Sequence, residues 1–537
     1  MVLDSTVMNV SISQVVADLH STVPEVQLAI TAYTLVMAAF MLTGAKFGDI
    51  WGRRRAFAIG LVVYGIGSLT TALSPNITVL LIGWSGIEGL GAVLVIPAIA
   101  SLTAANYSGK ERALAFALLG GISGAAAAAG PLIGGFVTTA LSWRVVFASE
   151  TVIVIGMLFV VRKISDKREH VPVKLDVVGS ALSALGMALT VFGILKISQW
   201  GFFRPTGALT VGGQRITPFG FSAVPFVIAA GVSVLGLFAR WEERVEARGR
   251  TPLLRTDLVR IPQMRAGLST VLSQYLILAG TFFVLPLYLQ LVLGKDALHT
   301  GLKILPISIA MMITATLGPR LATRMSPRRV VEIGMGVLFV SIVALMLSIG
   351  PDLASWAFGV SLAGFGAGLG LTISQLGNIV MSSVSASRAS EAGGVQGVAQ
   401  NLGQSLGTAL IGAVLLSQLT TGFQEQVQAS TLPDRVKTQV AQGTEQGLAM
   451  VSQAEARSIA EDAHLSPGQT DDVVTLYRDE QVAALKRALL VASLFVLVGA
   501  WFARSLPDRA LAEPPGAPSI DPEGRGTPPE IGVPAAL

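Results

Sequence analysis

The sequence predicts an all-helical protein that crosses a membrane many times. Of its 537 residues, 52% are hydrophobic and only 13% are charged, whereas about 25% of the residues in a soluble chain are charged. The mean hydropathy is +0.65, and apolar runs long enough to cross about 30 Å of hydrocarbon recur along most of the chain. Glycine is abundant, with 58 residues, which favours helices that pack closely through small side chains.

About thirteen apolar runs have the length of a membrane span. They cover residues 26–44, 56–73, 77–104, 114–141, 145–161, 177–197, 219–238, 266–293, 302–317, 330–349, 354–380, 395–419 and 488–506. The run at residues 1–16 contains Asp4 and is too short to cross on its own. Counted as a truncated first span, it brings the total to about fourteen and puts both ends of the chain on the same side.

Lysine and arginine residues mark one side of the predicted bundle. The basic loops alternate along the chain and contain Arg53–Arg55, Lys110 and Arg112, Arg162–Lys174, Arg240–Arg265, Arg320–Arg329 and Arg388. Because cytoplasmic loops carry the excess of these cations, we expect both termini in the cytoplasm. The net charge of +5 therefore reflects topology, and no nucleic-acid partner is expected.

A charged, glycine-containing loop occurs at equivalent places in the two halves of the chain. The first copy is Gly44–Arg55 and the second, weaker copy is Gly318–Arg329. The notable residues of the first copy are Gly44, Gly48, Asp49, Gly52, Arg53, Arg54 and Arg55. We expect the glycines to form a tight turn and the arginines to hold it on the cytoplasmic side. A repeated loop of this kind predicts a transporter built from internal repeats.

A second glycine motif lies in the run at residues 114–141. It reads Gly130-Pro131-Leu132-Ile133-Gly134-Gly135. Proline removes a helical donor and is expected to kink the span, while the glycines let another helix approach closely. Close packing alone would explain the glycines, but a kink between glycines favours a contact that moves.

With these motifs in place, the chain resembles the major facilitator superfamily and, within it, the fourteen-span drug:proton antiporters. Gly44–Arg55 is similar to the superfamily's loop signature after the second span, and Gly130–Gly135 to the antiporter signature of the fifth span. Leu3–Val10 is similar to the first-span signature of the fourteen-span group, and Pro286–Gln290 to the pattern near the ninth span. The resemblance implies proton-coupled efflux of lipophilic, cationic drugs or quaternary ammonium compounds by alternating access. It also implies a monomer in the lipid bilayer of a bacterial inner membrane.

The resemblance also implies the domain organisation. Two six-helix bundles are expected at residues 1–162 and 265–506, joined by residues 163–264, which would hold a linker and two additional central spans. Within the second bundle, residues 420–487 are expected to form an insertion on the outer side.

Two segments differ in composition from the predicted spans. The outer insertion predicts short amphipathic helices, broken at Leu432–Asp434 and at Ser466–Gly468. Residues 507–537 contain Glu-Pro-Pro-Gly and Thr-Pro-Pro-Glu, which predicts a disordered cytoplasmic tail.

Asp4, Glu88 and Glu150 are the candidate sites for proton and substrate binding, because each places a carboxylate within an apolar run. Glu88 stands where the family usually has glutamine, with Ser85 in place of the usual arginine, and Glu150 stands where asparagine is usual. A lone charge costs several kcal/mol in an apolar helix, so each carboxylate is expected to bind either a proton or a cationic substrate. The alternative for Glu88 and Glu150 is that the side chain faces a loop or forms a structural ion pair with a nearby cation.

Asp49 is expected to act in gating. We expect it at a helix N-terminus, paired with one of Arg53–Arg55, as a latch that closes the inner face in one state. A static topology anchor is the alternative. In the second copy of the loop, Thr323 stands in place of Asp49, so a second latch is weaker or absent.

Amides and aromatic residues of the second half are candidates for the wall of a central cavity. They are Gln274, Tyr275, Phe282, Tyr288, Gln375 and Asn378. Aromatic faces favour lipophilic cations. Interhelical hydrogen bonds are the more frequent use of amides in a membrane, and aromatic residues there are more often core or lipid-facing.

Other kinds of chemistry are disfavoured. The chain has no cysteine and four histidines, none in metal-binding spacing, so no metal and no cofactor are expected. No Gly-x-x-x-x-Gly-Lys-Ser/Thr loop indicates ATP use, and no nucleophile–base constellation indicates an enzyme. The alternatives to drug efflux are export of a lipid or an endogenous metabolite, and a membrane sensor or scaffold that does not transport.

The start of the sequence departs from the family pattern. Family members place an apolar segment before the position that matches Asp4, whereas only Met1, Val2 and Leu3 precede it here. Because Asp4 should lie at mid-membrane, we expect an apolar extension upstream of Met1 in the natural chain.

Overall fold

The regular structure of the chain is almost entirely helical. The computed structural model describes residues 2–107, 115, 126, 129–164, 175–203, 205, 209–211, 214–322, 324–350, 355–384, 389–444, 448 and 450–508. Within these residues, strands occur only as a hairpin of two three-residue segments, β1 (Leu209–Val211) and β2 (Gln214–Ile216). The predicted all-helical fold class is confirmed. Most of the predicted charged linker, and the predicted tail beyond residue 508, lie outside the described residues.

Twelve helices of the described residues are long and apolar enough to cross a membrane. Those of the first half are α3 (Val23–Trp51), α4 (Arg53–Ala72), η1 (Leu81–Glu88) continued by α6 (Gly89–Asn106), α8 (Trp143–Val161), α9 (Val177–Leu195) and α11 (Val224–Ala247). Those of the second half are α13 (Pro262–Leu287) continued by η3 (Tyr288–Val292), α14 (Ala297–Ala322), α15 (Pro327–Ser348), α16 (Ser355–Met381), α17 (Ala389–Ala429) and α20 (Pro467–Ala503). Each of these helices matches one predicted run.

The two remaining predicted runs fall on shorter helices. The first run forms α1 (Val2–Val10) and α2 (Ile12–Asp18). The described part of the run at 114–141 is mainly the apolar helix Ala129–Ala140, and most of its earlier residues lie outside the described part of the chain. Short elements at the helix ends are α5 (Ile77–Leu80), α10 (Ile197–Trp200), η2 (Pro218–Gly220) and α12 (Thr256–Arg260).

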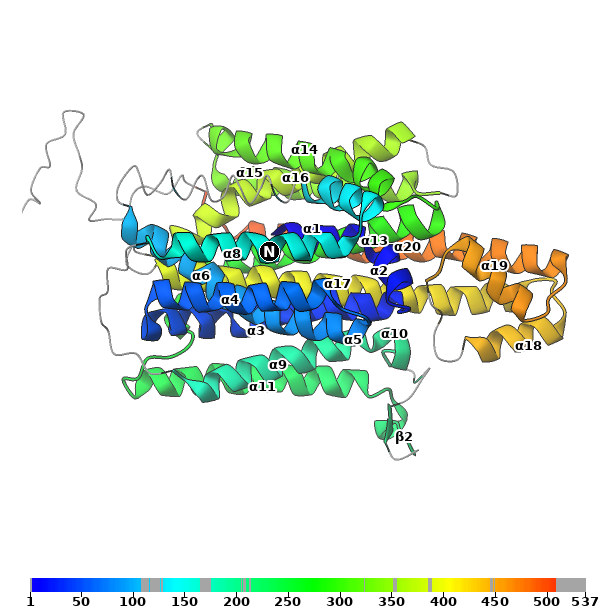
Figure 1. Cartoon of the computed structure of the whole chain (residues 1–537), viewed down its shortest axis with the longest axis horizontal. Helices are drawn as coiled ribbons and strands as arrows, with labels where there is room; N and C mark the ends of the chain where they lie inside the picture. The colour runs from blue at the N-terminus through cyan, green and yellow to red at the C-terminus, as the bar shows by residue number, and fades with distance from the viewer. Residues whose placement is uncertain are drawn as a thin grey trace, which may run out of the picture.

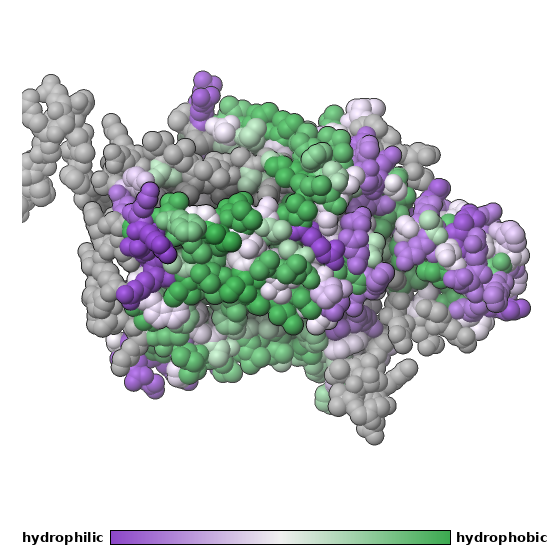
Figure 2. All heavy atoms as spheres, in the orientation of Figure 1, coloured by the Kyte–Doolittle hydropathy of each residue, from purple (hydrophilic) through white to green (hydrophobic). Residues whose placement is uncertain are grey.

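The long helices lie side by side and present an apolar belt. Figure 1 shows them running along the longest axis of the molecule. In Figure 2 hydrophobic residues cover the middle of this face, and hydrophilic residues gather toward its two ends. Large apolar side chains such as Val152, Val340 and Leu347 are exposed. The chain is therefore a multi-pass membrane protein whose apolar surface faces hydrocarbon.

The two ends of the bundle differ, and we name them by their structure. At the basic end, Gly52 joins α3 to α4 beside Arg53–Arg55. At the cap end, α18 (Asp434–Gly443) and α19 (Gln453–Asp462) project beyond the other helices (Figure 1).

The helices pack as two groups and a separate pair. We call α1 to α8 the first group and α13 to α20 the second group. α9 packs against α11, and it also contacts α3 and α17. The two groups meet where α3 packs on α17 and where α1 packs on α13 and α14. The predicted domain boundaries remain predictions.

The loop after α3 is shorter than the sequence predicts. α3 continues to Trp51 and α4 begins at Arg53, so Gly52 alone makes the turn, with a φ of +94°. Glycine adopts such a φ without steric cost. Gly44 and Gly48 lie on α3 itself, and the prediction that they help to form the turn was wrong.

Gly44 serves a helix contact instead of a turn. A Cβ at Gly44 would overlap the carbonyl oxygen of Val93 on α6. In the second copy of the motif, a Cβ at Gly318 of α14 would overlap the side chain of Ser374 on α16. Both copies of the motif therefore use their first glycine to bring two helices of one group into close contact, which supports an internal repeat.

The Gly130–Gly135 motif is also a place of close approach. A Cβ at Gly130 would overlap the Thr6 side chain of α1. A Cβ at Gly135 would overlap the carbonyl of Ala297, at the start of α14 in the second group. The motif thus lies at the contact between the groups, and its small residues allow the helices to touch through their backbones.

The predicted insertion forms a helical cap. α17 has 41 residues and α20 has 37, so both helices extend well beyond the roughly 20 residues that cross a membrane. α18 begins at Asp434, directly after the predicted break at Leu432–Asp434. α20 begins at Pro467, where Ser466 and Gln469 form a capping box. Both predicted breaks are helix starts, because proline and a capping residue favour the first turn.

An ion pair between the half-exposed Arg487 and a buried carboxylate fixes the base of the cap. Arg487 Nη1 lies 2.5 Å from Glu480 Oε1, and the Glu480 side chain is 1% exposed. Gln426 of α17 donates to the other carboxylate oxygen of Glu480 at 2.5 Å. A Cβ at Gly422 would overlap that carboxylate. α17 and α20 therefore pack around a buried carboxylate that Arg487 and Gln426 stabilise.

We predict that Arg487→Met lowers the free energy of unfolding by about 1–3 kcal/mol, because the buried Glu480 carboxylate loses its cation. Thermal unfolding of the purified protein in detergent measures the change. Arg457→Met is the matched control, since Arg457 and Asp471 form an ion pair whose side chains are 49% and 63% exposed, and such pairs contribute about 0–1 kcal/mol. Equal shifts in melting temperature for the two variants would contradict this prediction.

Candidate functional site

Asp4, Glu88 and Glu150 come together inside the first group. Carboxylate oxygens of the three residues lie within 4.8 Å of one another. Asp4 and Glu88 are 0% exposed and Glu150 is 9% exposed. The structure therefore brings together the three carboxylates selected from the sequence, and we call them the carboxylate triad.

Three different helices carry the triad. Asp4 lies on α1, Glu88 is the last residue of η1, and Glu150 lies on α8. η1 is a π-helix of eight residues, a widened form that is rare and is frequent at functional sites. Glu88 thus stands at the point where the widened segment returns to the regular α-helix of α6.

Glycines of α4 bring that helix close to the triad. A Cβ at Gly67 would overlap the backbone of Glu88, and a Cβ at Gly65 would lie 2.9 Å from Val154 of α8. Because Tyr64 and Ser68 are four residues apart, they lie on the same face of α4. The close approach allows both hydroxyl groups to reach the carboxylates.

These hydroxyl groups link the triad into one network. Tyr64 donates to Glu150 Oε2 at 3.1 Å and lies 3.4 Å from Asp4 Oδ2. Ser68 donates to Glu88 Oε2 at 2.8 Å and lies 3.4 Å from Glu150 Oε2. Each hydroxyl has a single proton to donate, so it serves one carboxylate at a time. The buried Glu88 Oε1 accepts no hydrogen bond from the described residues.

Aromatic rings form a dry wall beside the triad. Trp84 Nε1 lies 3.4 Å from Asp4 Oδ2. The Trp84 ring stacks on Tyr33 with centroids 4.9 Å apart, and Phe147 meets its edge at 6.1 Å. Both Trp84 and Phe147 are 0% exposed. Excluding water strengthens every electrostatic interaction of the carboxylates.

The arrangement favours binding of a cation. Two unit charges about 4.8 Å apart repel by about 3–4 kcal/mol at an effective dielectric constant of about 20. That repulsion is relieved when a proton or another cation enters the triad. The two kinds of cation would compete for the same oxygens, so the site has the chemistry needed to exchange one for the other.

The triad could also hold a metal ion. Three carboxylate oxygens within 4.8 Å of one another are a possible ligand set, and hard cations such as Mg²⁺ or Mn²⁺ prefer oxygen ligands. The sequence analysis expected no metal site, because it considered histidine spacing and not carboxylates from distant helices. Metal binding therefore has to be distinguished from proton binding by experiment.

The gating residues lie at the basic end. Asp49 is in the last turn of α3, which ends at Trp51, so its predicted place at a helix N-terminus was wrong. The single-residue turn at Gly52 leaves the N-terminus to Arg53. Asp49 is exposed, and its carboxylate forms no ion pair with described residues of Arg53–Arg55 in this state. Arg53 instead donates to the carbonyl of Ser101 on α6 at 3.3 Å.

Hydrogen bonds between the two groups join them toward the cap end. Gln290 of η3 donates to the carbonyl of Val10 at 2.6 Å. The backbone N–H of Leu298, at the start of α14, donates to Thr139 Oγ1 at 3.1 Å. Near the start of α3, Gln27 donates to the carbonyl of Thr408 on α17 at 2.8 Å. Within the described residues, the two groups are therefore in contact on the cap side.

The residues predicted to line a central cavity have mixed environments. Gln274 is buried and lies 3.4 Å from the carbonyl of Leu369, between α13 and α16. Tyr288 is buried, and its hydroxyl donates to the carbonyl of Gly350 at 2.7 Å. The others are the buried Phe282 and Gln375, the partly buried Tyr275 and the exposed Asn378. Gln274 and Tyr288 have structural partners, and a cavity wall made by this set stays a prediction.

Sequence analysis missed the residues that connect the triad, namely Tyr64, Ser68 and Trp84. A signal for two of them exists, because Tyr64 and Ser68 are polar, four residues apart, and lie in an apolar span beside two glycines. Nothing in the local sequence around Trp84 indicates a contact with Asp4, which is 80 residues away.

Comparisons with known proteins agree with the fold. The family model of the Major Facilitator Superfamily matches residues 1–408. A probable actinorhodin transporter of Streptomyces coelicolor is 30% identical over 82% of this chain and 74% of its own length. The multidrug resistance protein Stp of Mycobacterium tuberculosis is 25% identical over 94% of this chain and 90% of its own length. The drug efflux pump JefA of the same species is 27% identical over 94% and 96%.

Solved structures support the same fold. An inward-facing, unoccupied structure of a bacterial homologue of the human lysosomal transporter Spinster has a TM-score of 0.55 and 14% identity, and the match covers 95% of this chain and 96% of that one. This likeness concerns the fold. Together with the family model and the similarity to antibiotic and drug efflux proteins, it establishes that the chain belongs to the major facilitator superfamily of membrane transporters.

Proposed function

We propose that the chain exports lipophilic, cationic drugs from a bacterial cell in exchange for protons. The observation that carries the proposal is the carboxylate triad, a buried cluster that gains from any bound cation. Relatives named for resistance to or export of actinorhodin, tetracenomycin C and puromycin support an antibiotic as the substrate, and the proposed positive charge of the substrate rests on the triad. The cap end would then face outward and the basic end the cytoplasm, as the positive charges of the loops favour.

The exchange follows from competition at the triad. A cationic substrate that enters from the basic end displaces a proton from the carboxylates. After the groups rock about their contact, protons from outside displace the substrate, and the inward proton gradient makes the cycle run toward export. The hydrogen bonds of Tyr64 and Ser68 can shift between carboxylates as the bound cation changes.

The state described here fits the inward-facing stage of that cycle. The groups touch through Val10, Thr139 and Gln27 on the cap side, and Asp49 has not formed its ion pair at the basic end. On this proposal Asp49 pairs with an arginine of the basic end after the groups rock, which would close the inner side.

The central test is ethidium efflux from proteoliposomes with an imposed proton gradient. We predict that Asp4→Asn and Glu88→Gln each reduce gradient-driven efflux by about ten- to a hundredfold, the equivalent of about 1.5–3 kcal/mol for one charge-assisted contact. Glu243→Gln is the matched control, because Glu243 is exposed on α11 and its ion pair with Arg260 is exposed too. Unchanged coupled efflux in both triad variants would remove the triad from the mechanism.

Direct competition can be measured without a membrane. We predict that ethidium added to the protein in weakly buffered detergent solution releases about one proton per dye bound, because one positive charge replaces another. The release should fall as the pH is raised, since the triad then holds fewer protons before ethidium arrives. A proton-release titration in which Mg²⁺ acts as well as ethidium, and blocks it, would favour a metal site instead.

The contact at the cap end can be locked, because the chain has no native cysteine. Thr139→Cys combined with Leu298→Cys places thiols on two residues that are in contact, since the Leu298 backbone N–H now donates to Thr139 Oγ1. We predict that oxidation cross-links the pair and stops ethidium efflux, and that a reductant restores it, because the groups can no longer separate on that side. Each single variant is the control. Full efflux by the cross-linked protein would show that this contact does not need to open.

A further inference from the structure

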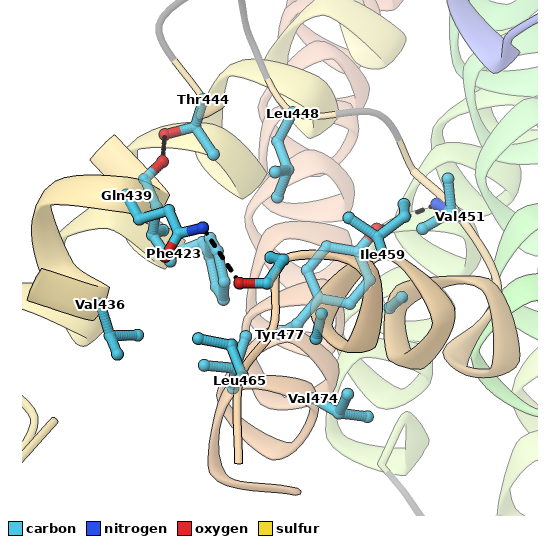
Figure 3. A pocket seen from close by; sticks show the side chains of 15 residues that line it. Phe423, Val436, Gln439, Thr444, Leu448, Val451, Ile459, Leu465, Val474 and Tyr477 are labelled. Carbon is cyan, nitrogen blue, oxygen red and sulfur yellow. Dashed lines mark hydrogen bonds between the residues drawn. The ribbon is translucent and has the colours of Figure 1, made fainter. Parts of the chain in front are cut away.

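The cap contains a cavity of about 460 Å³ that the proposed exchange does not use. The end of α17, the helices α18 and α19 and the start of α20 surround it. Figure 3 shows side chains such as Phe423, Val436, Ile459 and Tyr477 directed into the space between these helices. The cavity therefore lies beyond the membrane spans, in the insertion at the cap end.

The wall of the cavity is apolar, and none of the described residues that line it is charged. Apart from Gln439 and Thr444, every lining residue is aliphatic or aromatic. Phe423 and Tyr477 contribute two rings that meet edge to face, with centroids 5.6 Å apart. Such a wall gives affinity by removing apolar surface from water, at about 25 cal/mol for each Å².

The polar groups at the wall already have partners. Gln439 Nε2 donates to the carbonyl of Ala463 at 3.1 Å, and Thr444 Oγ1 accepts from Gln424 at 2.8 Å. The Tyr477 hydroxyl accepts from the backbone N–H of Val451 at 2.9 Å. A ligand in the cavity would therefore be held by its apolar body, and a ligand charge would stay at the solvent side.

Hydrogen bonds fix the positions of the cavity walls. The N–H of Leu448 donates to Thr420 Oγ1 of α17 at 2.9 Å, and Gln481 of α20 donates to the carbonyl of Val451 at 2.8 Å. The connection between α18 and α19 is thus tied to both long helices. These bonds preform the cavity, and a preformed site avoids part of the ordering cost of binding.

Size and surface indicate what the cavity would take. Cavities for drug-sized molecules have volumes of about 300–1,000 Å³, and 460 Å³ falls in this range. The visible outside of the cap is largely hydrophilic (Figure 2), which is unlike a face that docks another protein. Ile459 lines the cavity and is 57% exposed, so the cavity reaches solvent along α19.

We propose that the cap cavity is a second binding site, which takes the flat aromatic body of an exported compound on the outer side. The choice of ligand rests on the proposed function, because an exporter would present such compounds there as they leave the bundle. α17 and α20 lead from the membrane spans into the cavity wall, which places this site at the cap end of the second group.

The absence of native cysteine allows one reporter thiol to test the proposal. Ala456→Cys places a thiol in the cavity wall, and Ala454→Cys, two residues earlier on α19, places it on the exposed surface outside the wall. The full chain in lipid nanodiscs reacts with a membrane-impermeant maleimide, with and without ethidium. At about ten times Kd about one site in eleven is free, so alkylation at position 456 should slow about tenfold and alkylation at 454 should not change.

The same measurement in a Glu88→Gln background separates this site from the exchange mechanism. We expect the protection at position 456 to persist there, whether or not gradient-driven efflux exists, because the reporter needs no proton gradient. Equal alkylation rates with and without ethidium would overturn the proposal, and so would protection that disappears with Glu88→Gln. Protection present without ethidium and removed by delipidation would identify a lipid acyl chain as the occupant, which also overturns it.

Discussion

Three acids held next to one another in an apolar bundle form the constraint on which the first group of helices depends. Water is excluded from that place, so hydrogen-bond donors have to stabilise the carboxylates. The donors come from α4, and α4 can reach the acids only because Gly65 and Gly67 have no side chain. The hydrogen bonds of the site therefore depend on the close packing of α4.

Small residues also form the contact between the two groups of helices. At Gly135 the first group approaches the carbonyl of Ala297, and at Gly301 the second group approaches the carbonyl of Pro131. Contacts made through backbone atoms have few interlocking side chains to separate. Single hydrogen bonds such as that from Leu298 to Thr139 add direction to the contact.

The sequence predicted the fold class, the runs that become spans, the two breaks in the cap and the three acids, because each depends on local hydropathy, proline or an isolated charge. It did not predict that Tyr64 and Ser68 connect the acids, since that depends on how α1, α8 and η1 converge. Gly44 was assigned to a turn although it serves a helix contact, because a glycine in sequence does not reveal which of its two uses applies. Asp49 was predicted at a helix N-terminus for the same reason, since the glycines near it were expected to form the turn.

The unbroken course of α17 has a mechanical consequence. Its 41 residues run from the basic end into the cap, a length of about 60 Å at about 1.5 Å per residue. A tilt of about 10° at one end of a rod of that length swings the other end by about 10 Å. Because α18 and α19 are held to α17, a small tilt of this helix would move the cap by a larger distance. A label at the tip of the cap would therefore report rotations of the second group that are too small to measure at the carboxylate triad.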